Sequence, residues 1–152
     1  MTNLGGITPA VLLVDDEAAF VETMAKRLTK RGLKVYTALN GQAALDMLDD
    51  GGPSKVDVVI LDVKMPGMDG LATLAAIKQR HPNVEVVMLT GHATVENAIE
   101  GMKGGAYDYL MKPCDLDQLL AKVAEAVEKK RAHEAKILEA KVKMLTLKRG
   151  MD

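Results

Sequence analysis

The sequence predicts an α/β fold in which one parallel sheet is covered by helices on both faces. Two observations lead to this fold class. Short apolar runs that mostly lack alternation are typical of strands buried on both sides, as in a parallel sheet. Stretches with apolar residues at helical spacing lie between these runs, and a regular alternation of strand and helix builds a parallel sheet between two helix layers.

Five runs are expected to be strands, and all are rich in β-branched or aromatic residues. The run that begins at Lys34 is the weakest of them. The expected strands are Ala10–Val14, Lys34–Thr37, Val56–Leu61, Val84–Leu89 and Tyr107–Met111.

Five apolar stripes at helical spacing predict the helices. The first is followed by Gly32, where a helix would end. The stripes are Phe20, Val21, Met24 and Leu28; Ala44, Leu45 and Leu48; Leu71, Leu74 and Ile77; Val95, Ala98, Ile99 and Met102; and Leu116, Leu119, Leu120, Val123 and Val127. No stop signal follows the last stripe before Gly150, so we expect this helix to continue past the domain.

Length and composition indicate one domain with a helical extension. The 152 residues are 48% apolar and 27% charged, which is ordinary for a globular protein. We expect a domain over residues 8–128 and a helical extension over residues 129–152. The lone Cys114 excludes an internal disulfide. Because no apolar run is long enough to span a bilayer and the first residues do not resemble a signal peptide, we expect a cytoplasmic protein.

The net charge of −1 is unevenly distributed. Residues 129–152 contain eight Lys or Arg and three Asp or Glu, a net charge of +5. The first 128 residues contain 12 basic and 18 acidic residues, a net charge of −6. An acidic body argues against a DNA-binding face on the globular part.

A polar residue follows each of four predicted strands, at the point where the strand ends. Asp15 and Asp16 follow the first, Asp62 the third, Thr90 the fourth and Lys112 the fifth. Because the carboxyl ends of parallel strands meet at one edge of the sheet, these side chains should gather there. Taken singly, each has an ordinary structural interpretation as a helix cap, a turn residue or a surface charge. Four unrelated structural roles that meet at one edge of the sheet are much less plausible than one functional site formed by these residues.

Three crowded carboxylates need compensation, since otherwise one of them would take up a proton. A Mg²⁺ ion together with Lys112 balances their charge, and carboxylates with a backbone carbonyl suit that hard cation. Such a site favours phosphoryl transfer to a carboxylate, because the cations neutralise the phosphoryl oxygens and a hydroxyl donates to one of them. The nucleophile would be an aspartate, which gives an acyl phosphate.

At this point the sequence resembles the receiver domains of two-component response regulators. All five signature positions occur in the family's order and spacing, and the likeness covers about residues 8 to 128. The matching segments are Val14–Glu17 (VDDE), Leu61–Gly70 (LDVKMPGMDG), Leu89–His92 (LTGH) and Gly105–Pro113 (GAYDYLMKP).

The resemblance implies a flavodoxin-like (βα)5 three-layer sandwich with strand order 2-1-3-4-5. It implies that Asp62 accepts the phosphoryl group from a sensor histidine kinase or phosphotransfer protein. It also implies that Thr90 and Lys112 contact that group. It further implies that Tyr109 is the aromatic switch that follows Thr90 and that the Lys112-Pro113 bond is cis. Without the resemblance, Tyr109 would be taken for an ordinary edge-strand residue. The resemblance further implies a Mg²⁺ ion held by Asp15, Asp16, Asp62 and the backbone carbonyl of Lys64.

A weaker likeness connects the segments Thr90–Val95 and Met102–Tyr107 to receivers of nitrogen-regulation type transcription activators. In those proteins an ATPase and a DNA-binding domain follow the receiver. The chain therefore resembles the N-terminal part of a longer regulator. The residues after the domain contain no Walker motif and are too few for a helix-turn-helix with its own core.

The extension has two interpretations. Near-heptad spacing predicts a short coiled coil that would join two receivers into a homodimer, with Arg131 as a flaw in the stripe. The stripe comprises Ala124, Val127, Arg131, Ala135, Leu138, Val142 and Leu145. The alternative is a solvated, partly frayed linker helix. Basic residues on a solvent-facing helix are common, so we expect neither nucleic-acid nor membrane binding by this chain.

Three other functions compete with a signalling switch. A Mg²⁺-dependent phosphatase with an aspartyl nucleophile commonly has a second acid two positions after the nucleophile, where this chain has Lys64. We therefore expect a phosphoacceptor domain and not a turnover enzyme. The intact set of polar residues disfavours an inert binding module. The lack of a glycine-rich turn after the first strand disfavours dinucleotide binding.

Overall fold

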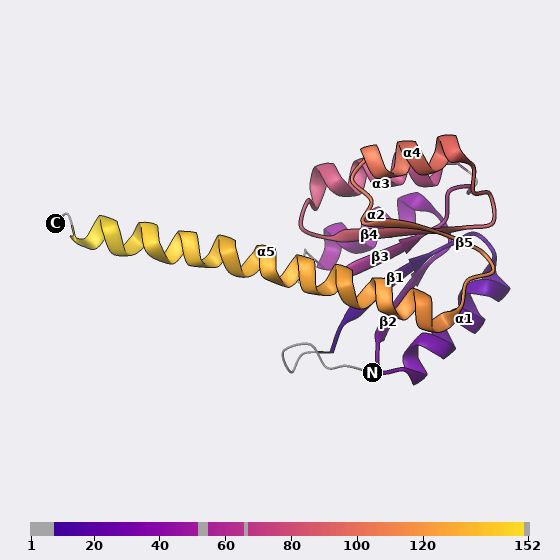
Figure 1. Cartoon of the computed structure of the whole chain (residues 1–152), viewed down its shortest axis with the longest axis horizontal. Coiled ribbons are helices and arrows are strands. Elements are labelled where there is room, and N and C mark those ends of the chain that lie inside the picture. Colours follow the sequence, from indigo (N-terminus) through magenta and orange to yellow (C-terminus); the bar gives the residue numbers. More distant parts are fainter. Residues whose placement is uncertain (1–7, 52–54, 66, 151–152) are drawn as a thin grey trace.

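The computed structural model describes residues 8–51, 55–65 and 67–150. In these residues five strands alternate with five helices (Figure 1). The strands are β1 (Ala10–Val14), β2 (Lys34–Ala38), β3 (Val58–Leu61), β4 (Glu85–Thr90) and β5 (Asp108–Met111). The helices are α1 (Ala18–Lys30), α2 (Gly41–Gly51), α3 (Gly70–Arg80), α4 (Val95–Lys103) and α5 (Leu116–Gly150).

The five strands form one parallel sheet in the order β2-β1-β3-β4-β5. The predicted fold class and strand order are therefore confirmed. Strand β1 lies inside the sheet and pairs on both sides, with Val14 opposite Ala38 of β2 and Leu61 of β3. The chain reverses its direction of travel across the sheet between β2 and β3, which creates a switch point at the carboxyl ends of β1 and β3.

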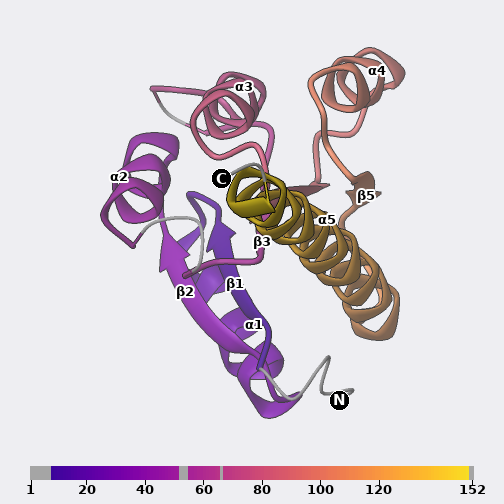
Figure 2. The same ribbon diagram turned by 90° about the vertical axis from the view of Figure 1, so that its left-hand side faces the viewer.

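Alternate residues of β1 point into two separate hydrophobic cores. Leu12 and Val14 pack with α2 and α3, whereas Val11 and Leu13 pack with α1 and α5. Figure 2 shows the resulting layers, with α2, α3 and α4 on one side of the sheet and α1 and α5 on the other. Burial on both faces explains why the strands lack an alternating pattern.

Two details differ from the sequence prediction. Strand β3 begins at Val58, because the backbone at Asp57 bends and its carboxylate accepts a hydrogen bond from the Ala10 N–H at 2.9 Å. Val56 is nonetheless fully buried, as its place in the apolar run predicted. The apolar stripe of α4 does not face the core, since Val95 is 76% exposed and Gly101 is the one residue of α4 that is buried.

Helix α5 crosses one face of the sheet and then projects far beyond the body (Figure 1). Val123 and Val127 are fully buried against the sheet, and the helix continues without interruption to Gly150. The predicted extension of this helix is confirmed. Among the helices of the described residues, none is both long enough and apolar enough to cross a membrane.

A buried ion pair anchors α5 where it leaves the body, at the amino-terminal edge of the sheet. The Lys130 ammonium lies 3.2 Å from the Asp57 carboxylate, and the residues are only 2% and 8% exposed. Arg131 also reaches Asp57 at 3.5 Å, and Glu134 accepts from Lys130 at 3.1 Å. Since Asp57 also accepts from the Ala10 backbone, this network links α5 to β1 and β3.

Substituting Asp57 with alanine should destabilise the fold strongly. It leaves the buried Lys130 ammonium with only part of its compensation and the Ala10 N–H without an acceptor, and breaking such a buried pair costs about 3 kcal/mol. Urea denaturation would measure the loss. Asp46→Ala is a matched control on an exposed site, expected to change stability by less than about 0.5 kcal/mol. Equal stability of the two variants would contradict the anchoring role.

Candidate functional site

Hydrogen bonds of the sheet hold the backbones of the predicted site residues at the carboxyl edge. The Asp15 N–H donates to the Ala38 carbonyl at 3.2 Å, and the Asp62 N–H donates to the Val14 carbonyl at 3.0 Å. At the other end of the edge, the Lys112 N–H donates to the carbonyl of Thr90, the last residue of β4, at 2.9 Å. The backbone hydrogen bonds of the sheet therefore bring residues that are distant in sequence to one edge.

Three aspartates form a cluster at this edge. One carboxylate oxygen from each of Asp15, Asp16 and Asp62 lies within 4.8 Å of the others. Asp15 and Asp62 are almost fully buried, whereas Asp16 is exposed at the rim. Burial and mutual proximity both penalise the charged forms of such groups.

Lys112 supplies the compensating positive charge. Its ammonium donates to Asp15 Oδ2 at 2.6 Å and lies 3.6 Å from Glu17. Burial acts to lower the pKa of Lys112, but the bond to Asp15 and the charges of Asp15, Asp62 and Glu17 outweigh it and raise that pKa. The ammonium also lies 4.0 Å from the centre of the Phe20 ring, a cation–π distance. Lys112 is thus held fully charged beside the cluster.

Several opposing contacts act on the pKa of the Asp62 carboxylate. Burial raises its pKa and the Asp15 charge raises it further, while the Thr90 hydroxyl, Lys112 and the Val63 N–H lower it. The net effect is a raised pKa. The Val63 N–H donates to Asp62 Oδ1 at 2.8 Å, which orients the carboxylate.

The loop after Asp62 is held against α3 by a glycine. A side chain at Gly70 would bring its Cβ to 2.0 Å from the Asp62 carbonyl oxygen, so only glycine fits this close approach. The Gly70 N–H donates to the Val63 carbonyl at 2.6 Å. In the same loop Gly67 has a positive φ of 75°, a backbone conformation that glycine adopts readily.

Tyr109 lies on β5 with its side chain turned into the protein. Its hydroxyl is buried and has no hydrogen-bond partner among the residues described. Burial raises its pKa, and the charge of Asp62 raises it further. A Cβ at Gly101 of α4 would lie 3.3 Å from the Tyr109 ring, so the absence of a side chain there makes room for the ring.

The cluster opens to solvent through a hollow of about 500 Å³. Its lining consists of Asp16, Glu17, Asp62, Lys64, Met65 and His92. Lys64 is exposed at this opening, and its backbone carbonyl is the predicted metal ligand. The backbone N–H of His92 donates to the Thr90 hydroxyl oxygen at 3.0 Å, which holds Thr90 at the end of its strand. The Lys112-Pro113 bond is cis.

The donor set fits a hard divalent cation. Three carboxylates lie within reach of one ion, and oxygen ligands of this kind suit Mg²⁺. Asp15 already accepts from the Glu17 N–H at 2.9 Å and from Lys112, whereas no such bond is recorded for the rim residue Asp16 among the described residues. The excess of negative charge at this edge is what such a cation would neutralise.

Sequence reasoning identified the polar residues of the site but missed the groups that position them. Phe20 was interpreted only as part of the apolar stripe of α1, and nothing in the sequence links it to a lysine 92 positions away. Gly101 was not singled out either. A glycine within an amphipathic helix is the one signal that could have indicated a close approach of another element.

Comparison with known proteins gives a consistent result. The family of response regulator receiver domains matches residues 11–124 of this chain. The DNA-binding transcriptional regulator NtrC of Klebsiella pneumoniae is 41% identical over 115 residues, which are 76% of this chain and 24% of that protein. The chain therefore spans about a quarter of the length of the curated relatives it matches.

Solved structures agree with this match. A response regulator receiver domain protein from Clostridium thermocellum superposes with a TM-score of 0.77 at 34% identity, covering 82% of this chain and 98% of that one. The receiver domain of NtrX from Brucella abortus superposes with a TM-score of 0.71 at 36% identity, covering 78% of this chain and 98% of that one.

Replacing Asp62 with asparagine should stabilise the metal-free protein. The raised pKa shows that the buried carboxylate is unfavourable when charged, and an amide of the same shape removes that charge. We expect a gain of about 1 kcal/mol at neutral pH, a size typical of relieving strain at a functional site. Thermal unfolding in the presence of a chelator would measure it. Because a folded-state pKa above the unfolded value favours folding at low pH, the gain should shrink as the pH falls. A loss of stability at neutral pH would contradict this account.

Proposed function

The chain belongs to the response regulator receiver domain family, and from this premise we propose that it accepts a phosphoryl group on Asp62. The observation that carries the proposal is the cluster of Asp15, Asp16 and Asp62 with Lys112 bonded to its edge. Receiver domains are the phosphoaccepting domains of two-component signalling, so Asp62 would act in signal transduction and not in catalytic turnover.

In the proposed reaction the donor is a phosphohistidine. An oxygen of the Asp62 carboxylate attacks phosphorus, a P–O bond forms, and the P–N bond to the donor imidazole breaks. The imidazole leaves with the electron pair and is protonated. The Val63 N–H bond to Oδ1 supports this role, because it fixes the carboxylate while the hollow leaves access to it.

Asp15, Asp16, Asp62 and the backbone carbonyl of Lys64 would hold a Mg²⁺ ion beside the acceptor. When bound, the ion supplies positive charge that neutralises the oxygens of the transferring group. The Lys112 ammonium, which is bonded to Asp15, would supply a second positive charge. The raised pKa of Lys112 supports this role, since the group remains charged throughout the neutral range.

Thr90 and Tyr109 are the proposed switch. The Thr90 hydroxyl, at the end of β4, would donate to a phosphoryl oxygen, and Tyr109 would follow its movement. The buried and unpaired hydroxyl of Tyr109 supports this proposal, because leaving such a group without a partner costs free energy that an alternative position could recover.

The proposed partners are a sensor histidine kinase or phosphotransfer protein as phosphoryl donor and a second copy of this chain. A cytoplasmic location follows from the proposed partner kinase. NtrC of Klebsiella pneumoniae is a DNA-binding transcriptional regulator, and for this chain a place in such a longer regulator is part of the proposal. The match covers only 24% of NtrC, and we propose no nucleic-acid contact by the residues described.

Incubation with a small acyl phosphate and Mg²⁺ should label the chain with one phosphoryl group. The adduct should be stable in acid and labile in base, as an acyl phosphate is. Asp62→Asn should abolish the label, which intact-mass spectrometry would measure, and Asp46→Asn is a matched control that should retain it. The expected stability of Asp62→Asn ensures that a loss of label does not reflect unfolding. Full labelling of Asp62→Asn would move the acceptor elsewhere, and continued release of phosphate would indicate a phosphatase.

Millimolar Mg²⁺ should raise the thermal unfolding midpoint by mass action. At ten times the dissociation constant the gain is about 1.4 kcal/mol. Asp16→Ala removes an exposed ligand without disturbing the core, so its unfolding midpoint should rise much less in Mg²⁺. Asp46→Ala should respond as the unsubstituted chain does. If Asp16→Ala responded equally, the ion would not bind at this cluster.

A further inference from the structure

The Lys112 ammonium is contacted on two sides at the carboxyl edge of the sheet. It donates to Asp15 Oδ2 at 2.6 Å. Asp15 is only 1% exposed and also accepts from the Glu17 N–H, so this carboxylate is fixed in place. The second contact is the Phe20 ring, whose centre lies 4.0 Å from the ammonium. A lysine ammonium has more than two N–H donors, so a donor remains for a further acceptor.

The contact with the ring is close for its kind. Cation–π attraction acts within about 6 Å of a ring centre and is strongest where water is excluded. The other lysine ammoniums that lie over rings in the described residues are 5.0 to 5.6 Å from the centres of tyrosine rings. The Lys112 side chain is only 16% exposed, so its contact with Phe20 is both shorter and partly shielded from water.

Phe20 differs from the rest of the apolar stripe of α1. Val21, Met24 and Leu28 are buried in the core. Phe20 packs against the same core but is only half-buried. The core therefore fixes the ring, while the ring also contacts the ammonium of a residue that follows β5. A residue needed for packing alone has no reason to make this second contact.

An exposed acid competes for the same ammonium. Glu17 lies 3.6 Å from the Lys112 ammonium, and its side chain is 67% exposed at the mouth of the hollow above the cluster. A lysine side chain is flexible, so the ammonium could turn toward Glu17 and into solvent. The Phe20 ring opposes that movement, because it attracts the ammonium at its position beside Asp15.

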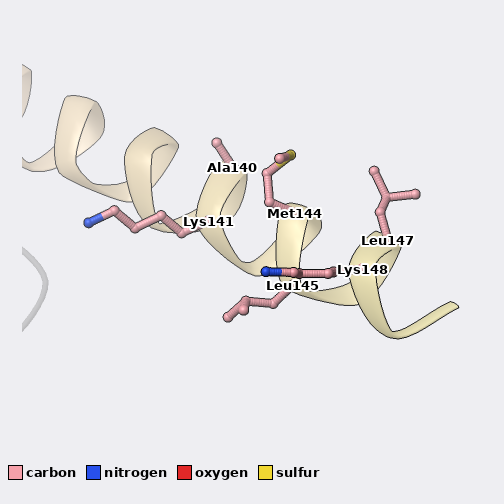
Figure 3. Close-up of a pocket in the computed structure, with 6 residues that line it drawn as sticks. All are labelled: Ala140, Lys141, Met144, Leu145, Leu147 and Lys148. Atoms are coloured by element: carbon pink, nitrogen blue, oxygen red, sulfur yellow. The ribbon is translucent and has the colours of Figure 1, made fainter. Parts of the chain in front are cut away.

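Lysines without such contacts show the alternative. Lys141 and Lys148 line a hollow of about 870 Å³ along the projecting end of α5 (Figure 3). Both are exposed, and neither has a carboxylate or ring partner among the described residues. Bringing such a side chain to one position costs conformational entropy. Lys112 has already lost much of this freedom before any phosphoryl donor arrives.

We propose that Phe20 is a positioning residue for phosphoryl transfer to Asp62. Its ring holds the Lys112 ammonium beside Asp15, so that the remaining donor is available to an oxygen of the incoming phosphoryl group. A positive charge that is in place beforehand stabilises the transferring group more than one that must first be moved there. The inference rests on the proposed function, since Phe20 has this task only if Asp62 is the acceptor.

Replacing Phe20 with leucine keeps an apolar side chain but removes the ring. The limiting rate of labelling at saturating acyl phosphate and Mg²⁺ should fall about fivefold, the size expected for a partly desolvated cation–π contact. The donor concentration that gives half of the limiting rate should stay nearly constant. Phe20→Tyr keeps the ring and should retain most of the rate.

Tyr36→Leu is the matched control. It removes a ring that contacts the Lys34 and Lys55 ammoniums, away from the acidic cluster, and it should leave the limiting rate unchanged. Thermal unfolding of both leucine variants would check that they are folded at the temperature of the assay. Equal limiting rates for Phe20→Leu and Tyr36→Leu would overturn the proposal.

A combined substitution separates action through Lys112 from a loss of packing. In a Lys112→Met background, labelling should be slow, and Phe20→Leu should cause no further loss of rate because no ammonium is left to position. A further loss of the same size in this background would show that Phe20 acts by another route, and the proposal would be wrong.

Ring-current shifts test the contact without any phosphoryl donor. In the metal-free chain, the Lys112 Cε protons should resonate upfield of those of other lysines, and Lys112→Met identifies their signal by its loss. The upfield shift should disappear in Phe20→Leu and persist in Phe20→Tyr. A labelled chain without this shift would overturn the role of Phe20 alone. A chain that shows the shift but takes no label would instead overturn the proposed function, and the role of Phe20 with it.

Discussion

The repulsion between the buried carboxylates of Asp15 and Asp62 is the constraint on which the rest of this structure depends. Each is almost fully buried, and an exposed third carboxylate, Asp16, lies beside them. One ammonium, Lys112, offsets part of this charge. The consequence is a folded state that carries excess negative charge at one edge of the sheet. The site therefore favours the binding of a positively charged group at that edge, and this is why the cluster can respond to a cation.

Carboxylates that repel each other stay close together only if the backbone fixes their positions. The ladder bonds at Asp15, Asp62 and Lys112 extend the sheet past its strand ends, so the site residues are held by the same interactions that hold the fold. Gly70 then fits the following helix against the Asp62 carbonyl, where any side chain would clash. The buried strands supply the free energy that keeps the repelling groups together. This is a common pattern, in which stability elsewhere in the fold offsets strain at the site.

The sequence predicted the parallel sheet and the clustering of the polar residues because both follow from local patterns, whereas the strand order was implied by the resemblance to receiver domains. Strands buried on two faces are readable as apolar runs, and parallel connectivity then decides which strand ends meet. The contact between Phe20 and Lys112 could not be predicted, since it depends on how α1 is rotated against the sheet. The exposed stripe of α4 was misleading for the same reason. Apolar spacing shows that a helix has one apolar face, but it does not show that this face is turned toward the chain's own core.

Helix α5 joins the two edges of the sheet. It begins at Leu116, four residues after Lys112, and it leaves the body at the opposite edge, where Lys130 is buried against Asp57. The helix is continuous between these points, so a shift at its start is transmitted to its projecting end if the helix moves as one body. The ion pair opposes such a shift, because separating two buried charges is costly. The projecting segment is therefore held in a fixed direction relative to the acidic cluster. A fixed direction lowers the entropy cost of pairing two helices, and it also means that pairing constrains the positions of both bodies.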